Sequence, residues 1–566
     1  MTRMTTTVPW QDQAQKKRAD TWSKIPREWL LDDQVMSEAK SRRKLTGKFI
    51  ENLLAANEQK ITALDSLQLV SCMLNKTFSA EEVATAFCKR AAVAHQLNNC
   101  LHEIFFDQAL QRARELDQHY AKTGSVLGPL HGLPVSLKDQ FHVKGVETTM
   151  GYVGWIGTYE GKRGTGKELN SNSQLVDELL SLGAVLYCKT SLPQTLLLGE
   201  THNNVNGYTM NPVNQLVSCG GSSGGEAALQ ALRGSTLGVG TDIGGSVRIP
   251  AAFCGTYSIK PTTTRLSYKD VANSNPGQTN IPSSIGLMGI TLPSLRLLMT
   301  AILSTQPWLR DPDVVPLPWR GDHEYVKASR PLCFGIMATD GVVMPHPPIL
   351  RGMRLVKEAI EKAGHKTIPW EPPSHAEATN IHSDFMSCDG GANIFAQLRL
   401  SKEPVVEEKK HDLGNGPVPP LPLLDFQRSC LRRKAYRASY AAYWNSTQEK
   451  TSTGHPVDAV IMPVAPTAAV LPGRYRHFGY TVINNLLDSS CVCIPVTHAD
   501  KNVDIFDHDY KPKNETDRLN WEGYDVDKYD GAPVGVQVVG RVLQEEWTLS
   551  VAETVVDALS EVHQGP

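Results

Sequence analysis

The chain has 566 residues, of which 41% are hydrophobic and 20% are charged, a balance typical of a folded globular protein. Its net charge of −2 gives no basic footprint, so neither nucleic acid nor an anionic membrane is expected as a partner. The 11 cysteines are an odd number without CxxC spacing, which favours reduced thiols and a cytoplasmic location.

The amino-terminal segment shows neither a targeting nor a membrane pattern. Residues 1–20 lack the apolar core of a secretory signal, and no run in the chain approaches the ~18 apolar residues of a spanning helix. Residues 1–78 are polar with a helical pattern. We predict that they form a helical extension that packs on a larger domain of residues 79–566; an arm that binds a partner is the alternative.

Helices and short strands alternate in the first half of the chain. Ser79-Ala-Glu-Glu82 predicts a capping box at the start of one helix, and Asp107 is expected to cap a second helix. The predicted elements that follow are a strand at 133–137, a helix at 173–183 and a strand at 184–187. This order favours an α/β fold with a largely parallel sheet, and it places Lys138 at a strand end, where α/β enzymes carry their chemistry.

Two glycine- and serine-rich clusters come next, Gly220–Gly225 and Gly244–Ser246, on either side of a predicted helix at 226–232. Glycines beside serines permit tight turns and leave backbone N–H groups uncovered. A hydroxyl beside uncovered amides offers what acyl transfer requires, a nucleophile and a place for the oxyanion. Taken alone, such a cluster is more often a flexible loop, and a lone Lys-Asp pair is usually a surface feature.

The second half of the chain gives a weaker pattern. Helices are predicted at 294–303, 345–364 and 425–444, and strands at 457–464, 491–496 and 531–540. Residues 402–424 are interpreted as a loop or linker, and residues 500–530 as an acidic loop. The basic side chains of the helix at 425–444 are interpreted as a solvated face, with nucleic-acid binding as the alternative.

The motifs together resemble the amidase signature family. GGSSGGE at 220–226 is followed by GTDIGGSVR at 240–248, with Ser222 placed 24 residues before Ser246, and Lys138 lies in a stretch similar to the family's lysine motif. The resemblance covers about residues 77–559. Residues 85–156 look more narrowly like the fungal acetamidase-type branch, which also carries a helical extension. The resemblance to the family implies a large twisted, mixed and mostly parallel sheet with helices on both faces, and a catalytic core at about 130–262.

This resemblance also assigns residues to roles. Ser246 would be the nucleophile, Ser222 the bridging serine and Lys138 the base, with a cis peptide bond between Gly221 and Ser222. The residues expected at the oxyanion or the substrate are Ile243, Gly244, Gly245 and Leu196, together with the amide of Ser246. The residues expected to support the site are Ser223, Thr241, Asp242 and Arg248. The set requires no metal and no cofactor.

The three motifs suit one another chemically. A serine hydroxyl needs a base near neutral pH, and lysine has a reference pKa of about 10.4. Burial disfavours the ammonium form, so a buried Lys138 would be neutral and could draw a proton from Ser246 through Ser222. The reverse path would deliver that proton to the departing amine.

We therefore predict hydrolysis of a small or medium amide, primary amides first, to an acid and ammonia or an amine through an acyl-enzyme. Acyl transfer to another amine, a tailoring amidase of secondary metabolism and a non-catalytic scaffold with a relic site stay open. The substrate and the oligomeric state are also open, a homodimer included. The chain lacks GxxxxGK[ST], and Ser246 does not lie in GxSxG, which argues against a phosphate-binding loop and an α/β-hydrolase.

A subunit of a tRNA-dependent amidotransferase shares this core, but the 137 residues before Lys138 exceed what that compact subunit usually carries. Two departures from the family pattern bear on specificity. Cys219 stands where many members have proline, and Asp488–Cys493 is an unusual stretch expected near the pocket.

Overall fold

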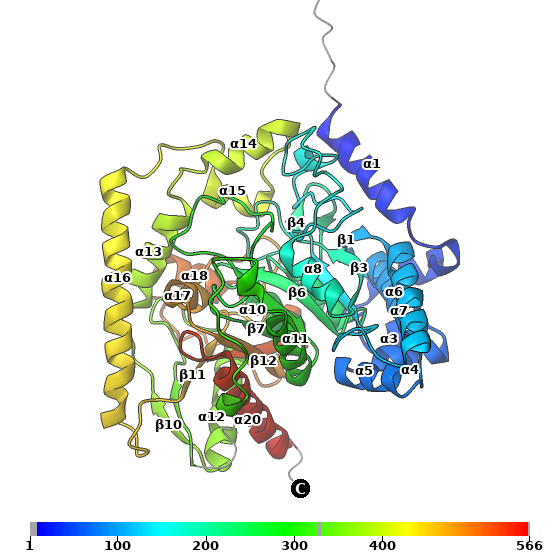
Figure 1. The fold of residues 1–566 in the computed structure, drawn as a ribbon. Coiled ribbons are helices and arrows are strands. Elements are labelled where there is room, and N and C mark those ends of the chain that lie inside the picture. Colours follow the sequence, from blue (N-terminus) through cyan, green and yellow to red (C-terminus); the bar gives the residue numbers. More distant parts are fainter. Residues whose placement is uncertain (1–7, 325–329, 564–566) are drawn as a thin grey trace, which may run out of the picture.

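One mixed β-sheet crosses the whole molecule and forms the centre of the fold (Figure 1). The structure is a computed structural model that describes residues 8–324 and 330–563. Within these residues the sheet has eleven strands, in the spatial order β1 (Leu101–Ile104), β3 (Val185–Thr190), β2 (Pro134–Lys138), β6 (Leu237–Asp242), β8 (Ser284–Gly289), β7 (Tyr257–Lys260), β12 (Cys491–His498), β13 (Pro533–Val539), β11 (Ala459–Pro463), β9 (Cys333–Ile336) and β10 (Lys366–Pro369). A separate short hairpin pairs β4 (His202–Asn203) with β5 (Gly207–Tyr208).

The strand directions follow the predicted α/β pattern only in part. β2 runs parallel to β3 and β6, and β9 runs parallel to β10 and β11. The other neighbouring pairs of the described sheet are antiparallel. The large mixed sheet is confirmed, with more antiparallel pairs than the sequence pattern indicates. Strands β2, β3, β6, β8 and β13 are buried along their whole length, so the core lies along the middle of the sheet.

Helices surround this sheet. The amino-terminal group comprises α1 (Trp10–Trp22), α2 (Asp33–Ser41), α3 (Lys48–Glu51), α4 (Ala56–Ala63) and α5 (Ser66–Leu74). The next are α6 (Ala80–Asn98), α7 (Phe106–Thr123), α8 (Gln174–Ser181), α9 (Gly224–Ala231), α10 (Arg248–Cys254) and α11 (Leu292–Ser304). The last group comprises α12 (Pro347–Lys362), α13 (His375–Met386), α14 (Ala392–Ser401), α15 (Glu407–Leu413), α16 (Leu423–Ser446), α17 (Gly479–Leu487), α18 (Glu515–Glu522), α19 (Val526–Tyr529) and α20 (Glu545–His563).

Both faces of the central strands are covered. Neighbouring residues of a strand point to opposite faces, so Leu237 and Gly238 on β6 look in opposite directions. A side chain at Gly238 would collide with Glu226 of α9. Leu237 instead pairs with Gly289 of β8, which packs against Leu295 of α11. The helices α9 and α11 therefore lie on opposite sides of the sheet, as predicted.

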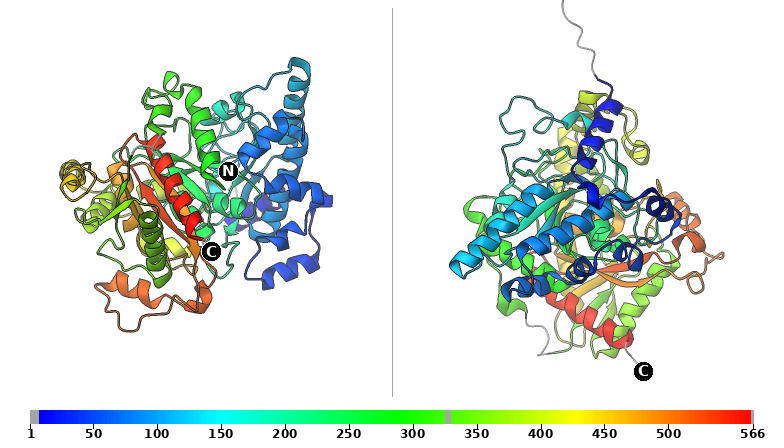
Figure 2. Two further views of the ribbon diagram at one scale, coloured as in Figure 1. Left: turned by 90° about the horizontal axis from the view of Figure 1, so that it is seen from below. Right: turned by 90° about the vertical axis from the view of Figure 1, so that its right-hand side faces the viewer.

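The amino-terminal helices pack on one end of the molecule, opposite α16 (Figures 1 and 2). Apolar side chains such as Ile25, Leu45 and Leu69 belong to the same buried cluster as the central strands. Lys17 of α1 lies 2.5 Å from the buried Glu103 of β1 and 2.5 Å from Glu147. Although burial opposes the charge of Lys17, these two carboxylates raise its pKa above the ordinary range. The predicted boundary between residues 78 and 79 stays a prediction.

Two segments predicted as loops contain helices. Residues 402–424 include α15. It has Glu407 and Glu408 in its first turn and basic residues in its last turn, and charges in these positions stabilise a helix by compensating its dipole. Residues 500–530 include α18 and α19. The side chain of Asn514 caps α18 by accepting a hydrogen bond from the Asp517 N–H at 3.0 Å. Favourable end charges in α15 and side-chain capping in α18 thus stabilise short helices within sequences whose polar composition is typical of loops.

The helix starts predicted near residues 79 and 107 differ in outcome. The capping box of Ser79 and Glu82 at the start of α6 is confirmed. Asp107 lies in the first turn of α7, with Phe105 at the capping position, so the prediction that Asp107 caps this helix was wrong.

On α16, Arg432 lies 3.0 Å from both Glu377 and Asp384 of α13, so this basic residue is paired within the protein.

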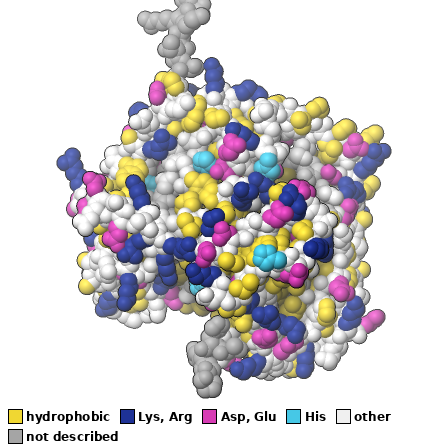
Figure 3. All heavy atoms as spheres, turned by 180° about the vertical axis from the view of Figure 1, so that it is seen from behind, with side chains coloured by type: hydrophobic (Ala, Val, Ile, Leu, Met, Phe, Trp, Pro, Cys, Tyr) yellow, Lys and Arg dark blue, Asp and Glu magenta, His cyan; other side chains and the backbone are white. Residues whose placement is uncertain are grey.

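The surface carries both signs of charge. Lys and Arg side chains are intermixed with Asp and Glu over the face in Figure 3. Within residues 8–324 and 330–563, no helix has both the length and the apolar character needed to cross a bilayer.

The carboxyl-terminal helix α20 is anchored by buried ion pairs. The Arg265 guanidinium lies 2.9 Å from Glu545 and 2.6 Å from Glu546, and all three side chains are 0% exposed. Removing one partner from a buried pair leaves an uncompensated charge and costs about 3–5 kcal/mol. We therefore expect Arg265→Met to lower the free energy of unfolding by about 3–5 kcal/mol in urea denaturation.

Arg518 offers a matched control, because it also pairs with two carboxylates, Glu515 and Glu522, but at the exposed surface. Exposed pairs contribute little, so Arg518→Met should leave the midpoint of unfolding unchanged. Equal midpoints for the two variants would contradict the anchoring role of Arg265.

Candidate active site

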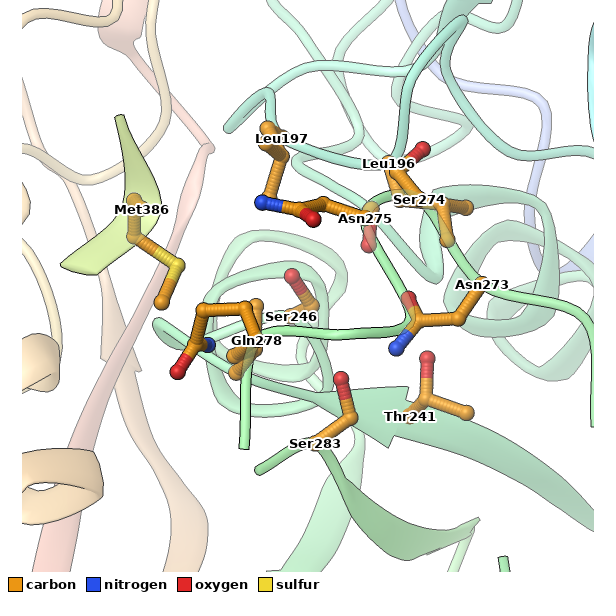
Figure 4. A pocket seen from close by; sticks show the side chains of 12 residues that line it. Leu196, Leu197, Thr241, Ser246, Asn273, Ser274, Asn275, Gln278, Ser283 and Met386 are labelled. Atoms are coloured by element: carbon orange, nitrogen blue, oxygen red, sulfur yellow. The ribbon is translucent and has the colours of Figure 1, made fainter. Parts of the chain in front are cut away.

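A pocket opens where the two glycine- and serine-rich clusters meet (Figure 4). It encloses about 440 Å³, including the open space at its mouth. Its apolar lining consists of Leu196, Leu197, Ile243 and Met386. Its polar lining consists of Ser222, Thr241, Ser246, Asn273, Ser274, Asn275, Gln278 and Ser283. The two serines singled out in the sequence and Leu196 thus face one space.

Lys138 lies at the end of β2, as predicted, and it is fully buried. Its Nζ lies 2.7 Å from the Ser222 Oγ and 2.9 Å from the Thr241 Oγ1. Burial lowers the pKa of Lys138 to about 7, although the negative charge of nearby Asp242 acts in the opposite direction. A large share of this lysine is therefore a neutral amine at neutral pH.

The hydrogen bonds around Thr241 orient that amine. The Ala272 carbonyl can only accept, so the Gln140 Nε2, 2.8 Å away, must be the donor. The Gln140 Oε1 then faces Thr241 and accepts its hydroxyl proton at 2.5 Å. Because the Thr241 proton is used in this way, the Thr241 Oγ1 accepts an N–H from Lys138. The second N–H and the lone pair of neutral Lys138 are left for the Ser222 Oγ.

The two serine clusters are held together by the backbone. The peptide bond between Gly221 and Ser222 is cis, as the resemblance implies. Gly221 has no room for a side chain, since a Cβ would lie 2.6 Å from the Glu200 carbonyl oxygen. The Ser223 N–H donates to the Ser246 carbonyl at 2.9 Å, which joins the first cluster to the second.

The carbonyl groups of the loop before Ser246 are fixed from outside. Asn485 donates to the Asp242 carbonyl at 3.4 Å, His382 to the Ile243 carbonyl at 2.9 Å, and Thr481 to the Gly244 carbonyl at 2.6 Å. In a trans peptide the N–H points away from its C=O. The N–H groups of the next residues therefore point away from these three side chains.

One of the predicted oxyanion donors is already occupied. The Gly245 N–H donates to the Asp242 Oδ1 at 2.8 Å, so this amide has an acceptor within the protein, and its role at an oxyanion stays a prediction. Within the described residues, the N–H groups of Ile243, Gly244 and Ser246 have no protein acceptor. Gly245 is required for another reason: its φ is +122°, and a Cβ there would lie 2.6 Å from the Thr481 Oγ1.

Asp242 and Arg248 form the frame of this loop. The Arg248 guanidinium donates to the Asp242 carboxylate at 2.9 and 3.1 Å, and both side chains are 0% exposed. Burial alone would raise the pKa of Asp242, but the charge and hydrogen bonds of Arg248 hold it well below its usual range. The ionised carboxylate also accepts the N–H of Val247 at 3.1 Å, which stabilises the turn beneath Ser246.

Several supporting side chains gave no signal in the sequence. Gln140, His382, Thr481 and Asn485 belong to ordinary helix or loop patterns, and three of them lie far along the chain from the loop that they hold. Burial lowers the pKa of His382 to about 4, so it donates to the Ile243 carbonyl as a neutral imidazole. No periodicity or motif distinguishes a histidine with this role from one in the core.

The two departures from the family pattern lie outside the pocket lining. The Cys219 thiol is buried and donates to the Thr209 carbonyl at 3.1 Å. Asp488 accepts hydrogen bonds from Thr263 at 2.9 and 3.0 Å, and the residues that follow enter β12. The expectation that 488–493 lies at the pocket was wrong, because Asp488 ends α17 and Cys491, Val492 and Cys493 belong to β12.

Comparisons with known proteins agree with these motifs. The profile of the Amidase family matches residues 82–549. The acetamidase of Emericella nidulans is 42% identical over 562 residues, with 98% of this chain and 99% of the relative covered, and Amidase 1 of Gibberella moniliformis is 39% identical over 535 residues, with 94% and 99% covered.

Solved structures give the same result. Fatty acid amide hydrolase has a TM-score of 0.88 and 32% identity, with 97% of this chain and 95% of that chain covered. A bacterial aryl acylamidase of the amidase signature family shares the fold at a TM-score of 0.64 and 19% identity, with 89% and 99% covered. The chain therefore belongs to the amidase family of enzymes that hydrolyse amide bonds, as its sequence predicts.

Proposed function

We propose that this pocket hydrolyses a small or medium carboxylic amide by a Ser-Ser-Lys relay with an acyl-enzyme intermediate. The observation that carries the proposal is the 2.7 Å contact between the buried Lys138 Nζ and the Ser222 Oγ, in a pocket that also holds Ser246. A neutral amine at this distance from a hydroxyl is a suitable base.

In the acylation step the Ser246 Oγ attacks the carbonyl carbon. Its proton passes to the Ser222 Oγ, and the Ser222 proton passes to the Lys138 Nζ. The oxyanion that forms is stabilised by N–H groups of Ile243, Gly244 and Ser246. Donors that are held in place before the reaction lower the barrier because they do not reorganise.

Collapse of this intermediate breaks the C–N bond. The Lys138 ammonium returns its proton through Ser222 to the leaving nitrogen, which departs as ammonia or an amine. Water then attacks the Ser246 ester, and the same relay accepts its proton and returns one to Ser246. The acid is released and the starting protonation state is restored.

The size of the substrate is proposed from the relatives. A short acyl group is compatible with a pocket that opens to solvent. Two relatives at 42% identity, from Emericella nidulans and Aspergillus oryzae, are named acetamidases. Short aliphatic amides are therefore the first substrates to test.

The nucleophile can be tested by ammonia release from a panel of short aliphatic and aryl amides. We expect Ser246→Ala to lower kcat by at least ~10³-fold with folding retained, because the other groups act only through this oxygen. The matched control is Ser258→Ala. Ser258 is also buried, its Oγ has no hydrogen-bond partner in the described structure, and the change should leave activity intact. Retained turnover in Ser246→Ala would refute the assignment.

The base predicts a definite pH dependence. Below a pKa of about 7 Lys138 becomes an ammonium ion and cannot accept a proton, so kcat/KM should fall about tenfold per pH unit there. Above that pKa the amine is neutral and kcat/KM should level off. A flat profile between pH 5 and 8, with circular dichroism showing an intact fold, would exclude Lys138 as the base.

Thr241 is predicted to be a positioning residue that acts through Lys138. Thr241→Val keeps the shape but removes the acceptor, so kcat/KM should fall about tenfold. The acceptor also stabilises the ammonium form, so its loss should shift the rising limb of the pH profile to lower pH. Thr241→Ser, which restores the hydroxyl, should restore the limb. An unshifted limb in Thr241→Val would rule out this role.

A further inference from the structure

Three carboxamide side chains line the pocket, and they differ in their partners. The Gln278 carboxamide is engaged at both ends, since its Nε2 donates to the Ile281 carbonyl at 2.9 Å and its Oε1 accepts the Ile281 N–H at 2.9 Å. The Asn275 side chain lies close enough to the Cys388 thiol to lower its pKa, although burial raises that pKa overall. Among the described residues, the Asn273 carboxamide has no hydrogen-bond partner. Its donor and its acceptor are therefore both available to a ligand.

Hydrogen bonds place Asn273 on the Lys138 side of the pocket. Ala272, the residue before it, is held by Gln140: the Ala272 N–H donates to the Gln140 carbonyl at 3.1 Å, and the Gln140 Nε2 donates to the Ala272 carbonyl at 2.8 Å. The Oε1 of Gln140 accepts from Thr241, which contacts Lys138. In Figure 4 the Asn273 carboxamide points into the pocket, toward Thr241 and Ser283.

The chemistry of the relay decides which part of the substrate comes to this side. Lys138 and Ser222 must return a proton to the leaving nitrogen, so that nitrogen faces their side of the pocket. The acyl substituent is bonded to the other side of the carbonyl carbon. It is then directed toward the apolar lining formed by Leu197, Ile243 and Met386.

We propose that Asn273 binds the leaving nitrogen of the substrate, its Oδ1 accepting one N–H of the amide. This inference rests on the proposed amide hydrolysis and narrows its substrate class to amides with at least one N–H on the leaving nitrogen. A primary amide has two N–H donors, so one can meet Asn273 while the lone pair of the nitrogen faces Ser222. A tertiary amide or an ester offers no such donor and gains nothing from this side chain.

The test compares two substrates with one acyl group, propionamide and methyl propionate. For Asn273→Ala we expect kcat/KM to fall about tenfold with propionamide, the size expected for one neutral hydrogen bond, and to stay within about twofold with the ester. The matched control is Asn280→Ala. Asn280 lies in the same loop but outside the pocket lining, and its Oδ1 meets only the Cys430 thiol, at 3.5 Å. It should change neither substrate's kcat/KM.

A second variant provides a test in case Asn273→Ala does not fold. Asn273→Asp keeps the acceptor and the shape but adds a negative charge near Lys138, which should move the rising limb of the pH profile to higher pH. Measured at pH 9, above that limb, Asn273→Asp should retain the preference for the amide over the ester that Asn273→Ala loses.

Each outcome decides the matter. A wild-type protein that hydrolyses neither compound and no amide of the panel overturns the proposed function and the role of Asn273 with it. A wild-type protein that hydrolyses both, together with an Asn273→Ala variant that is unchanged or that loses both activities equally, overturns the role of Asn273 alone.

Discussion

The site depends on one costly feature, the burial of the Lys138 amino group without a carboxylate in hydrogen-bond contact. Its Nζ meets two hydroxyl groups, from Ser222 and Thr241. Desolvation with no direct counter-charge is what lowers the pKa of this lysine to about 7. The contrast with Lys17 is instructive: that lysine is also buried, but it contacts two carboxylates and keeps its charge. The same side chain is a base in one place and a structural cation in the other.

The charged groups near Lys138 are paired with other residues, so none of them forms an ion pair with its amino group. Asp242 is ionised close to the base, but its oxygens are taken up by Arg248, Asn485 and the backbone of the loop. Asp139 follows Lys138 directly in the chain, yet it pairs with Lys189 at 2.8 Å. Both of these buried carboxylates thus pair with another cation, and Lys138 is left without a carboxylate partner.

The sequence predicted the parts of the site that lie within a short stretch of chain. The glycine- and serine-rich clusters are contiguous motifs, so Ser222, Ser246, Asp242 and Arg248 could be assigned from their resemblance to the family, and a predicted buried strand placed Lys138. The side chains that hold the carbonyl groups of the loop before Ser246 could not be predicted from the sequence. His382 is separated from Ile243 by 139 residues, and Thr481 from Gly244 by 237. Such contacts depend on how α13 and α17 dock, which hydrophobic patterning does not specify. The engaged Gly245 amide was missed for the same reason, since its acceptor is set by tertiary geometry.

The two edge strands of the sheet, β10 and β1, are protected from pairing with other chains in different ways. Unpaired edge strands invite other chains to add on and aggregate. The edge formed by β10 is four residues long and ends at Pro369, which has no N–H to offer an incoming strand. The edge formed by β1 has no proline within it, but α1 packs against it and Lys17 reaches its buried Glu103. The helix α1 therefore covers this edge, which leaves less of it open to pairing with another chain.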